Sequence, residues 1–321
     1  MSKIKKKILI TGSAGFIGFH CAKNLMELYP NFKIYGVDNF NKNYELKIKN
    51  TRNEILKKFP NYKFYKKDLN DKKFLKKLLR ENFNIIIHLA AQPGVRDVYN
   101  DPNIYFNNNL SGFFNLLTNI TKNTDLFIYG SSSSVYGNSK LSNEKSNTDN
   151  PLNFYAGSKK SNEIIATSFN DIIKAKIVGL RFFTCYGPFG RPDMAVFKFT
   201  RLISKGKKIF FHNYGKHLRD FTYIDDVIKC INLIINNPNK LNKIEIFNIG
   251  KEKPNSIREL TNLISFELGK EAIIKKIKAQ KGEVKTTKSN MNYFFKKFKY
   301  KPKTSLRSGI KKFISWYKTY E

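Results

Sequence analysis

The stretch Ile8-Leu9-Ile10-Thr11-Gly12-Ser13-Ala14-Gly15-Phe16-Ile17-Gly18 decides how this chain is expected to fold. Its apolar start predicts a short buried β-strand, and the glycine-rich part predicts a tight turn that opens a helix. Backbone N–H groups and the dipole at the start of such a helix attract phosphate oxygens. Because Gly12, Gly15 and Gly18 leave that backbone uncovered, we expect the turn to bind the pyrophosphate of a dinucleotide.

Short apolar segments that read as strands recur along the first half of the chain, with helix-like stretches between most of them. They are 7–11, 34–37, 62–66, 85–89, 126–130 and 177–180. This alternation predicts an α/β fold of the Rossmann type, a doubly wound parallel sheet. After about residue 180 the pattern becomes irregular, with Gly-Pro and Arg-Pro turns. We therefore expect an NAD-binding domain over 1–178, rejoined by part of 222–250, and a smaller substrate-binding lobe over 179–321.

The bulk composition bounds the class of protein. The formal net charge is +34, but the lysines are spread over the whole chain rather than gathered in one arm, so we expect no nucleic-acid partner. Cys21, Cys185 and Cys230 lack Cys-x-x-Cys spacing and the four histidines lack metal-ligand spacing, which predicts no metal and a reducing cytoplasm. The apolar run 8–10 is too short for a signal peptide, and no run reaches membrane-spanning length, so we expect no membrane insertion.

The ends of the next strands refine the dinucleotide site. Asp38 closes the second strand twenty residues after Gly18, where a carboxylate would bind the adenosine ribose hydroxyls and repel a 2′-phosphate, which favours NAD over NADP. Asp68 and Leu69 follow the third strand and border the adenine in this interpretation, although Asp68 is equally placed to cap a helix. After the fourth strand, we expect the nicotinamide side of the site to be lined by Leu89, Ala90, Ala91 and Gln92.

Tyr155 and Lys159 form the candidate catalytic pair. If residues 155–172 are a helix, these two side chains share a face, and the Lys159 ammonium is expected to lower the pKa of the Tyr155 hydroxyl. A cluster of four serines, 131–134, follows the fifth strand at the carboxyl edge of the sheet, and Ser132 is our choice among them. We expect Ser132 to bond the reacting hydroxyl, Tyr155 to remove its proton, and Lys159 to hold the phenolate and the nicotinamide ribose.

One predicted helix carries more apolar surface than a single sheet face usually covers. It spans 104–123 and includes six large apolar side chains, namely Phe106, Leu110, Phe113, Phe114, Leu117 and Ile120. A second subunit would cover the surplus, so we expect a homodimer.

The stretches 90–96, 179–195, 213–216 and 219–226 extend these motifs over most of the chain. With them the chain resembles the extended short-chain dehydrogenase/reductases, the NAD-dependent nucleotide-sugar epimerases and dehydratases, and within that family it is most similar to UDP-glucuronate 4-epimerases. The resemblance implies inversion of C4 of UDP-glucuronate through a 4-keto intermediate, giving UDP-galacturonate for polysaccharide synthesis. It also implies cofactor contacts at Phe16, Ile17, Asn39 and Asn109. Substrate contacts are implied at Arg96, Ser132, Ser133, Ser134, Thr184, Arg191, Met194 and Arg219.

Related decarboxylases and 4,6-dehydratases resemble the same scaffold but carry acidic residues in the turn after the reacting serine or threonine. Here Ser133 and Ser134 take those positions, which favours epimerisation over elimination or loss of CO2. Other readings stay open from the sequence: epimerisation of UDP-glucose or of a UDP-N-acetyl-uronate, a UDP-glucuronate decarboxylase, a dehydrogenase that releases NADH, and an NAD-binding regulator without catalysis.

Overall fold

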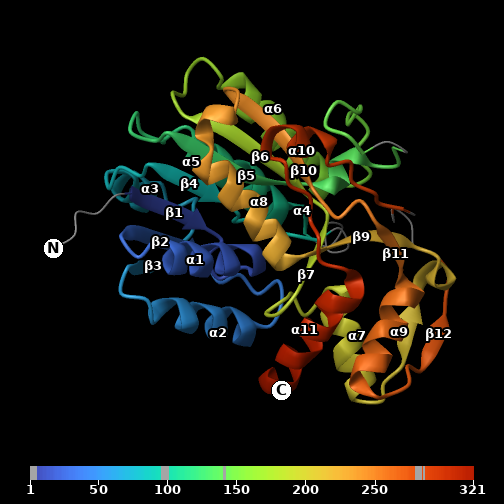
Figure 1. Cartoon of the computed structure of the whole chain (residues 1–321). Coiled ribbons are helices and arrows are strands. Elements are labelled where there is room, and N and C mark those ends of the chain that lie inside the picture. Colours follow the sequence, from blue (N-terminus) through green and yellow to red (C-terminus); the bar gives the residue numbers. More distant parts are fainter. Residues whose placement is uncertain (1–5, 95–100, 140–141, 279–283, 285) are drawn as a thin grey trace.

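The protein was analysed as a computed structural model that describes residues 6–94, 101–139, 142–278, 284 and 286–321. Within these residues a seven-stranded sheet forms the centre of the fold, in the order β10-β6-β5-β4-β1-β2-β3 (Figure 1). Its strands are β1 (Lys6–Thr11), β2 (Phe32–Asp38), β3 (Tyr62–Lys66), β4 (Ile85–His88), β5 (Leu126–Ser132), β6 (Lys176–Phe182) and β10 (Ile244–Ile249). All neighbouring pairs are parallel, which confirms the predicted Rossmann-type sheet.

Helices cover both faces of this sheet. Side chains of α1 (Phe16–Leu28), α2 (Leu46–Lys57) and α8 (Ile224–Asn236) share one apolar core with Ile8 and Ile10 of β1. On the opposite face, α3 (Lys72–Leu79), α5 (Gly112–Leu117) and α6 (Phe154–Ser168) share a second core with Leu9. Alternate residues of one strand thus enter opposite cores, as the two-residue period of a strand requires.

The helix expected over 104–123 is built from three segments instead. They are α4 (Pro102–Tyr105), the π-helical segment η2 (Phe106–Ser111) and α5, which ends at Leu117. A π-helical turn inserts one extra residue per turn and rotates the side chains that follow it.

A second, smaller lobe lies beyond the carboxyl ends of the central strands (Figure 1). It contains a three-stranded sheet of β11 (Pro254–Ser256), β9 (Leu218–Tyr223) and β7 (Thr184–Tyr186), and a pair formed by β12 (Ile274–Lys276) and β8 (Ile209–Phe211). Its helices are α7 (Ala195–Ser204), α9 (Ile257–Leu268) and α11 (Leu306–Tyr320). Short 3-10 segments follow β5, β8 and α8, namely η3 (Ser133–Tyr136), η4 (His212–Gly215) and η5 (Pro238–Lys240).

The chain passes between the two lobes more than once. After β9 it returns to the central sheet as α8 and β10, enters the smaller lobe again as β11, α9 and β12, and then returns as α10 (Asn292–Phe298). Phe294 of α10 packs edge-on against Phe247 of β10, with ring centroids 5.4 Å apart. Among the described residues, no helix is long and apolar enough to cross a membrane.

Candidate active site

A cavity of about 1180 Å³ lies between the carboxyl edge of the central sheet and the smaller lobe. Of the residues predicted to bind cofactor or substrate, those that line it are Gly12, Gly15, Phe16, Ile17, Gly18, Asp38, Asn39, Asp68, Leu69, Leu89, Ala90, Ala91, Ser132, Ser133, Ser134, Tyr155, Lys159, Thr184, Arg191, Met194 and Arg219. The parallel strands end at a common edge, so side chains far apart in the sequence meet there. Arg96 lies outside the described residues.

The glycine turn at the end of β1 requires its three glycines for steric reasons. Gly12 has φ of +71°, and a Cβ there would lie 2.6 Å from the Ala90 nitrogen. A Cβ on Gly15 would lie 2.9 Å from the Gly12 carbonyl oxygen, and one on Gly18 would lie 2.1 Å from the same atom. The turn is therefore closed against its own backbone, and α1 starts directly behind it with its first N–H groups toward the cavity.

Asp38 closes β2 beside this turn and is almost fully buried. Its carboxylate accepts hydrogen bonds from the backbone N–H groups of Phe40 at 2.8 Å and Ala14 at 3.2 Å. Burial raises the pKa of Asp38, and the nearby Lys49 ammonium opposes that rise. Asp38 thus holds the glycine turn through the Ala14 N–H and also lines the cavity.

Asp68 does not cap the helix that follows it. The N-cap of α3 is Asp71, whose side chain accepts from the Phe74 N–H at 2.9 Å. Asp68 instead accepts from the Asn39 amide at 2.7 Å, and both residues line the cavity.

Gln92 and Asn109, which were predicted to contact the cofactor, are not among the residues that line the cavity. The Asn109 side chain accepts from the Gln92 N–H at 2.7 Å and donates to the Ser158 hydroxyl at 3.0 Å. Both residues are buried, and these hydrogen bonds join them to other protein groups. They brace the loop after β4 against α6, a supporting role that the sequence did not reveal.

The candidate catalytic side chains come from β5 and α6. Ser132 ends β5, and Asn153 begins α6 by accepting from the Ala156 N–H at 2.9 Å, so Tyr155 lies in the first turn. Ser132 lies close enough to the Tyr155 hydroxyl for its side chain to oppose the rise in the Tyr155 pKa that burial causes. Lys159, one turn later, donates to the Gly130 carbonyl oxygen at 2.8 Å. The predicted triad is therefore assembled at the carboxyl end of β5.

The pKa of Tyr155 moves opposite to the sequence-based expectation. Burial raises it, and the hydrogen bond with Ser132 and the positive charge of Arg191 oppose that rise. Burial also lowers the pKa of Lys159 to about 8. The expectation was wrong because desolvation of the buried phenol outweighs the opposing contributions. The Lys159 ammonium bonds the Gly130 carbonyl, and Arg191, from the loop before α7, is the cation that opposes the rise.

The other side of the cavity belongs to the smaller lobe and is lined by polar side chains. Thr184 begins β7, Met194 precedes α7, and Arg219 lies on β9. Arg191 forms a two-point ion pair with Asp193, at 3.1 Å and 2.5 Å. Ser133 and Ser134 face this side from η3, and the Ser134 hydroxyl donates to Ser132 at 2.9 Å.

Several cavity-lining cations were not identified from the sequence. They are Lys49, Lys67, Lys198 and Arg201. Lys198 and Arg201 follow Met194 by four and seven residues on α7, so helical spacing from Met194 would have predicted a shared face. The described residues contain no group of three or more His, Cys, Asp or Glu side chains arranged to hold a metal ion.

Comparison with known proteins agrees with this geometry. Residues 8–250 match the model of the NAD-dependent epimerase/dehydratase family. An uncharacterized protein of Methanocaldococcus jannaschii is 42% identical over 97% of this chain and 96% of its own length. UDP-glucuronate 4-epimerase 4 of Arabidopsis thaliana is 38% identical over 98% of this chain and 75% of its own length.

Among solved structures, the UDP-glucuronic acid 4-epimerase of Bacillus cereus in complex with UDP-glucuronic acid and NAD superposes with a TM-score of 0.92. It is 32% identical to this chain and covers 98% of it and 100% of the solved chain. The family match spans the glycine turn, the serine cluster and the Tyr155/Lys159 helix together. This chain therefore belongs to the NAD-dependent epimerase/dehydratase family.

Proposed function

We propose that this protein is an NAD-dependent isomerase that inverts C4 of UDP-glucuronate to give UDP-galacturonate through a 4-keto intermediate. The observation that carries the proposal is that Tyr155, Ser132 and the buried Lys159, one helical turn from Tyr155, line the same cavity as the glycine turn. The relatives named UDP-glucuronate 4-epimerase support the choice of sugar.

The cavity wall fits NAD. The glycine turn offers backbone N–H groups where a Cβ would collide with backbone, which suits a pyrophosphate. Asp38 offers a carboxylate edge for the adenosine ribose hydroxyls and would repel a 2′-phosphate. Leu89, Ala90 and Ala91 add a flat, mostly apolar wall near Lys159. When bound there, NAD supplies reversible acceptance of hydride from C4.

The proton at O4 is handled by the residues of the chain. Tyr155 removes it, and Ser132 holds the hydroxyl in line through its own side-chain oxygen. Burial raises the pKa of Tyr155, and the Ser132 side chain and the positive charge of Arg191 oppose that rise and so favour the phenolate. Lys159 and Tyr155 together also hold the ribose next to the reacting carbon.

The uronate carboxylate calls for a cation and a hydroxyl, and Arg191 and Thr184 supply them in this proposal. A 4-keto uronate is a β-keto acid, which loses CO2 when the bond from C5 to the carboxylate aligns with the carbonyl π system. We assign Arg191, Thr184, Ser132 and Ser133 the task of holding the carboxylate out of that alignment. Ser133 and Ser134 also provide no carboxylic acid to assist chemistry at C5.

The UDP part is assigned to the smaller lobe. Arg219 on β9 and Met194 before α7 line the cavity there, and Lys198 adds a positive charge that favours the diphosphate. We accordingly assign NAD binding to residues 1–178, with α8 and β10, and sugar-nucleotide binding to the remainder of 179–321.

We further propose a homodimer that forms through the α4–α5 segment and α6. Exposed large apolar side chains gather on these helices, namely Ile104, Phe106, Phe114 and Ile164. Single exposed apolar residues are ordinary, whereas a group on adjacent helices marks an interface. Sedimentation of the wild type and of Phe106→Glu tests this: a dimer that becomes a monomer is expected, and a wild-type monomer contradicts it.

We also propose a cytoplasmic location, because free cysteines are typical of proteins in a reducing compartment. All three cysteines are free thiols in the structure, and burial raises the pKa of Cys21 to about 12, so that thiol is poorly reactive.

Purified protein should be incubated separately with UDP-glucuronate, UDP-glucose and their N-acetyl counterparts, with the configuration at C4 followed by proton NMR. Conversion of UDP-glucuronate alone is expected, and Tyr155→Phe should lower kcat by at least about 100-fold. Arg191→Gln and Thr184→Val should release UDP-pentose. Exclusive turnover of UDP-glucose, or full activity of Tyr155→Phe, would overturn the assignment.

A further inference from the structure

A buried ion pair lies behind the candidate catalytic side chains. Glu163 of α6 and Arg181 of β6 are 3% and 2% exposed. Their groups meet in a two-point arrangement, with Nε to Oε1 at 2.9 Å and Nη2 to Oε2 at 2.8 Å. The planar guanidinium and the planar carboxylate each fix the orientation of the other in such a pair. Neither residue belongs to the triad, and Glu163 does not line the cavity.

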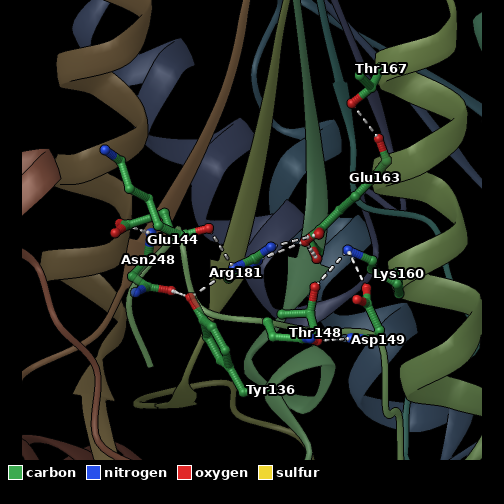
Figure 2. Close-up of polar contacts among 12 residues, drawn as sticks. Tyr136, Glu144, Thr148, Asp149, Lys160, Glu163, Thr167, Arg181 and Asn248 are labelled. Atoms are coloured by element: carbon green, nitrogen blue, oxygen red, sulfur yellow. Dashed lines mark hydrogen bonds and ion pairs between the residues drawn. The ribbon is translucent and has the colours of Figure 1, made fainter. Parts of the chain in front are cut away.

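The pair connects α6 with three strands of the central sheet. Glu163 accepts from the Ser131 hydroxyl of β5 at 2.6 Å. Arg181 donates to the Tyr136 hydroxyl at 2.9 Å, and Tyr136 donates in turn to Asn248 of β10 at 2.7 Å. Figure 2 shows Arg181 extending from Glu163 on α6 toward Tyr136 and Asn248 on its other side. The α6 helix is thus tied to β5 and β6 through one carboxylate, and to β10 through Arg181 and Tyr136.

The position of Glu163 on α6 links this network to the site. Tyr155, Lys159 and Glu163 are spaced four residues apart, so they follow one face of the helix over successive turns. Each faces the same short stretch of β5: Lys159 donates to the Gly130 carbonyl oxygen, Glu163 accepts from the Ser131 hydroxyl, and Tyr155 lines the cavity beside Ser132. Of the three, Glu163 has the most rigid anchor, because Arg181 holds both of its oxygens.

We propose that Glu163 and Arg181 are positioning residues, which hold this face of α6 in register with the end of β5 so that the Tyr155 hydroxyl reaches Ser132. The inference rests on the proposed function for the reaction that these residues serve. Stability alone is a weak reason for such a pair, because apolar residues of similar volume often stabilise a core equally well. Geometry is the stronger reason, since a misplacement of about 1 Å at a reacting group can lower the rate by about 100-fold.

The test compares Glu163→Gln, Arg181→Lys and Ser131→Ala with the wild type. Glu163→Gln keeps the shape and removes the charge, whereas Ser131→Ala cuts only the link from β5. Asp226→Asn is the matched control: Asp226 is also buried, and it accepts from the Tyr300 hydroxyl at 2.7 Å and the Thr304 N–H at 2.9 Å on the other face of the sheet. Thermal unfolding places these four variants and Arg181→Met on one stability scale.

The first readout separates kcat from KM with UDP-glucuronate. We expect Glu163→Gln to lower kcat by about 100-fold and Ser131→Ala by about tenfold, with KM changed by less than about threefold. Arg181→Lys should recover part of the activity that Arg181→Met loses, because it restores the charge without the second bond. Asp226→Asn should lose comparable stability and keep its kcat.

The second readout needs no substrate, so it stays informative if the sugar assignment fails. The ultraviolet titration of Tyr155, taken as the difference between each protein and its Tyr155→Phe derivative, reports how firmly Ser132 bonds the phenol. The charged and titratable groups around that hydroxyl, Lys159 on α6, Arg191 before α7 and Tyr105 on α4, are unchanged in every variant. We expect a higher Tyr155 pKa in Glu163→Gln and Ser131→Ala and an unchanged one in Asp226→Asn.

The outcomes are separable. A wild type that inverts no sugar rejects the proposed function, and the titration then decides the inference alone. An unchanged kcat and an unchanged Tyr155 titration in a folded Glu163→Gln overturn the positioning role. If Glu163→Gln does not fold, Ser131→Ala decides: a tenfold lower kcat with an unchanged melting temperature supports the role, and wild-type kcat rejects it.

Discussion

The two walls of the cavity differ in which part of the chain faces the ligand: backbone on one side and side chains on the other. On the sheet side, the glycine turn presents backbone, and its shape is fixed by contacts in which a single added Cβ would collide with another main-chain atom. On the side of the smaller lobe, the wall is made of charged and polar side chains such as Arg191 and Arg219. Arg191 is already engaged by Asp193, so that wall must exchange protein partners for ligand partners. The wall on the sheet side is therefore preformed, whereas on the wall of the smaller lobe Asp193 competes with the ligand for Arg191.

This difference determines how each wall selects one ligand over another. A backbone cradle accepts or rejects a ligand by shape at little reorganisation cost. A wall of paired side chains selects by the difference between a bond to the ligand and a bond to the protein. Substitutions on the sheet side should therefore act on cofactor retention and stability, and those on the lobe side on KM for particular sugars.

The largest effect is expected from Gly18→Ala. The new Cβ would lie 2.1 Å from the Gly12 carbonyl oxygen, so the turn must move. Overpacking of this kind costs about 3 kcal/mol, and the displaced turn should no longer retain NAD. Release of cofactor on denaturation, measured by chromatography, and chemical unfolding are the measurements.

Gly157→Ala is the control for that variant, because the nearest atom to its new Cβ, Pro151 Cγ, lies 3.9 Å away. In the interior of α6 this change should raise stability by about 0.5–1 kcal/mol. A Gly18→Ala protein that keeps its NAD would show that the turn is not preformed in the sense argued here.

Arg52 joins the two walls and offers the next largest effect. It is fully buried on α2 and donates to the carbonyls of Ala14 in the glycine turn at 2.9 Å and of Phe189 at 2.6 Å, in the loop that carries Arg191. Arg52→Met leaves these carbonyls without donors, which should cost about 2–3 kcal/mol. NAD retention and KM for UDP-glucuronate should both worsen, by about tenfold each.

Arg201→Met is the matched control for stability and NAD retention. The Arg201 guanidinium pairs with Glu45, and the two side chains are 26% and 50% exposed, so the loss should stay below about 1 kcal/mol. An Arg52→Met protein that changes only one of the two affinities would break the view that this residue couples the walls.

The contrast between the walls also explains what could be predicted from the sequence. A backbone site leaves a compositional trace, because Gly12, Gly15 and Gly18 are required wherever the main chain must approach closely. Strand ends are readable from apolar runs, so Asp38 and the serines after β5 could be assigned to the cavity. The six apolar runs correspond to β1 to β6 of the central sheet, and β10 lies within 222–250, the range expected to rejoin the first domain.

Residues that act by burial left no such trace. Arg52 looks like any arginine on a basic helix, and nothing in the sequence shows that it points inward. Asn109 and Gln92 were predicted to contact the cofactor, and their part in holding the loop after β4 was not foreseen, since an amide that braces a loop and one that binds a cofactor have the same chemistry. The pKa of Tyr155 was expected in the wrong direction because the spacing to Lys159 is visible in the sequence, whereas desolvation is not.

Lys159, on the sheet side of the cavity, gives a prediction for the pH dependence of the free energy of unfolding. Burial lowers its pKa from 10.5 to about 8, so between pH 8 and 10.5 the unfolded chain binds a proton that the folded chain has lost. Stability should therefore rise with pH across that window, and below pH 8 the full cost of burying the charge remains. In cofactor-free protein, Lys159→Met should raise the free energy of unfolding at pH 7 by about 2 kcal/mol and flatten this pH dependence.

Lys160→Met is the control, because Lys160 donates to Thr148 at the edge of the helix and is partly exposed. It should leave the pH dependence above pH 8 unchanged. A Lys159→Met protein that is less stable than the wild type at pH 7 would mean that the bond to the Gly130 carbonyl outweighs the cost of burial.

Asp193→Asn is expected to have the smallest effect of these substitutions, and it is the most direct test of the difference between the two cavity walls. Asp193 is 41% exposed and its pair with Arg191 is partly open to water, so Asp193→Asn should change stability by less than about 1 kcal/mol. The guanidinium fork cannot give both of its parallel bonds to Asp193 and to a uronate at once. Removing the competitor should lower KM for UDP-glucuronate about two- to fivefold. The Kd of UDP-glucose, measured by calorimetry, controls for the general loss of a negative charge near the diphosphate. It should be nearly the same in Asp193→Asn as in the wild type. A higher KM for UDP-glucuronate would instead mean that Asp193 aims Arg191 at the sugar, and the wall of the smaller lobe would then be as preformed as the glycine turn.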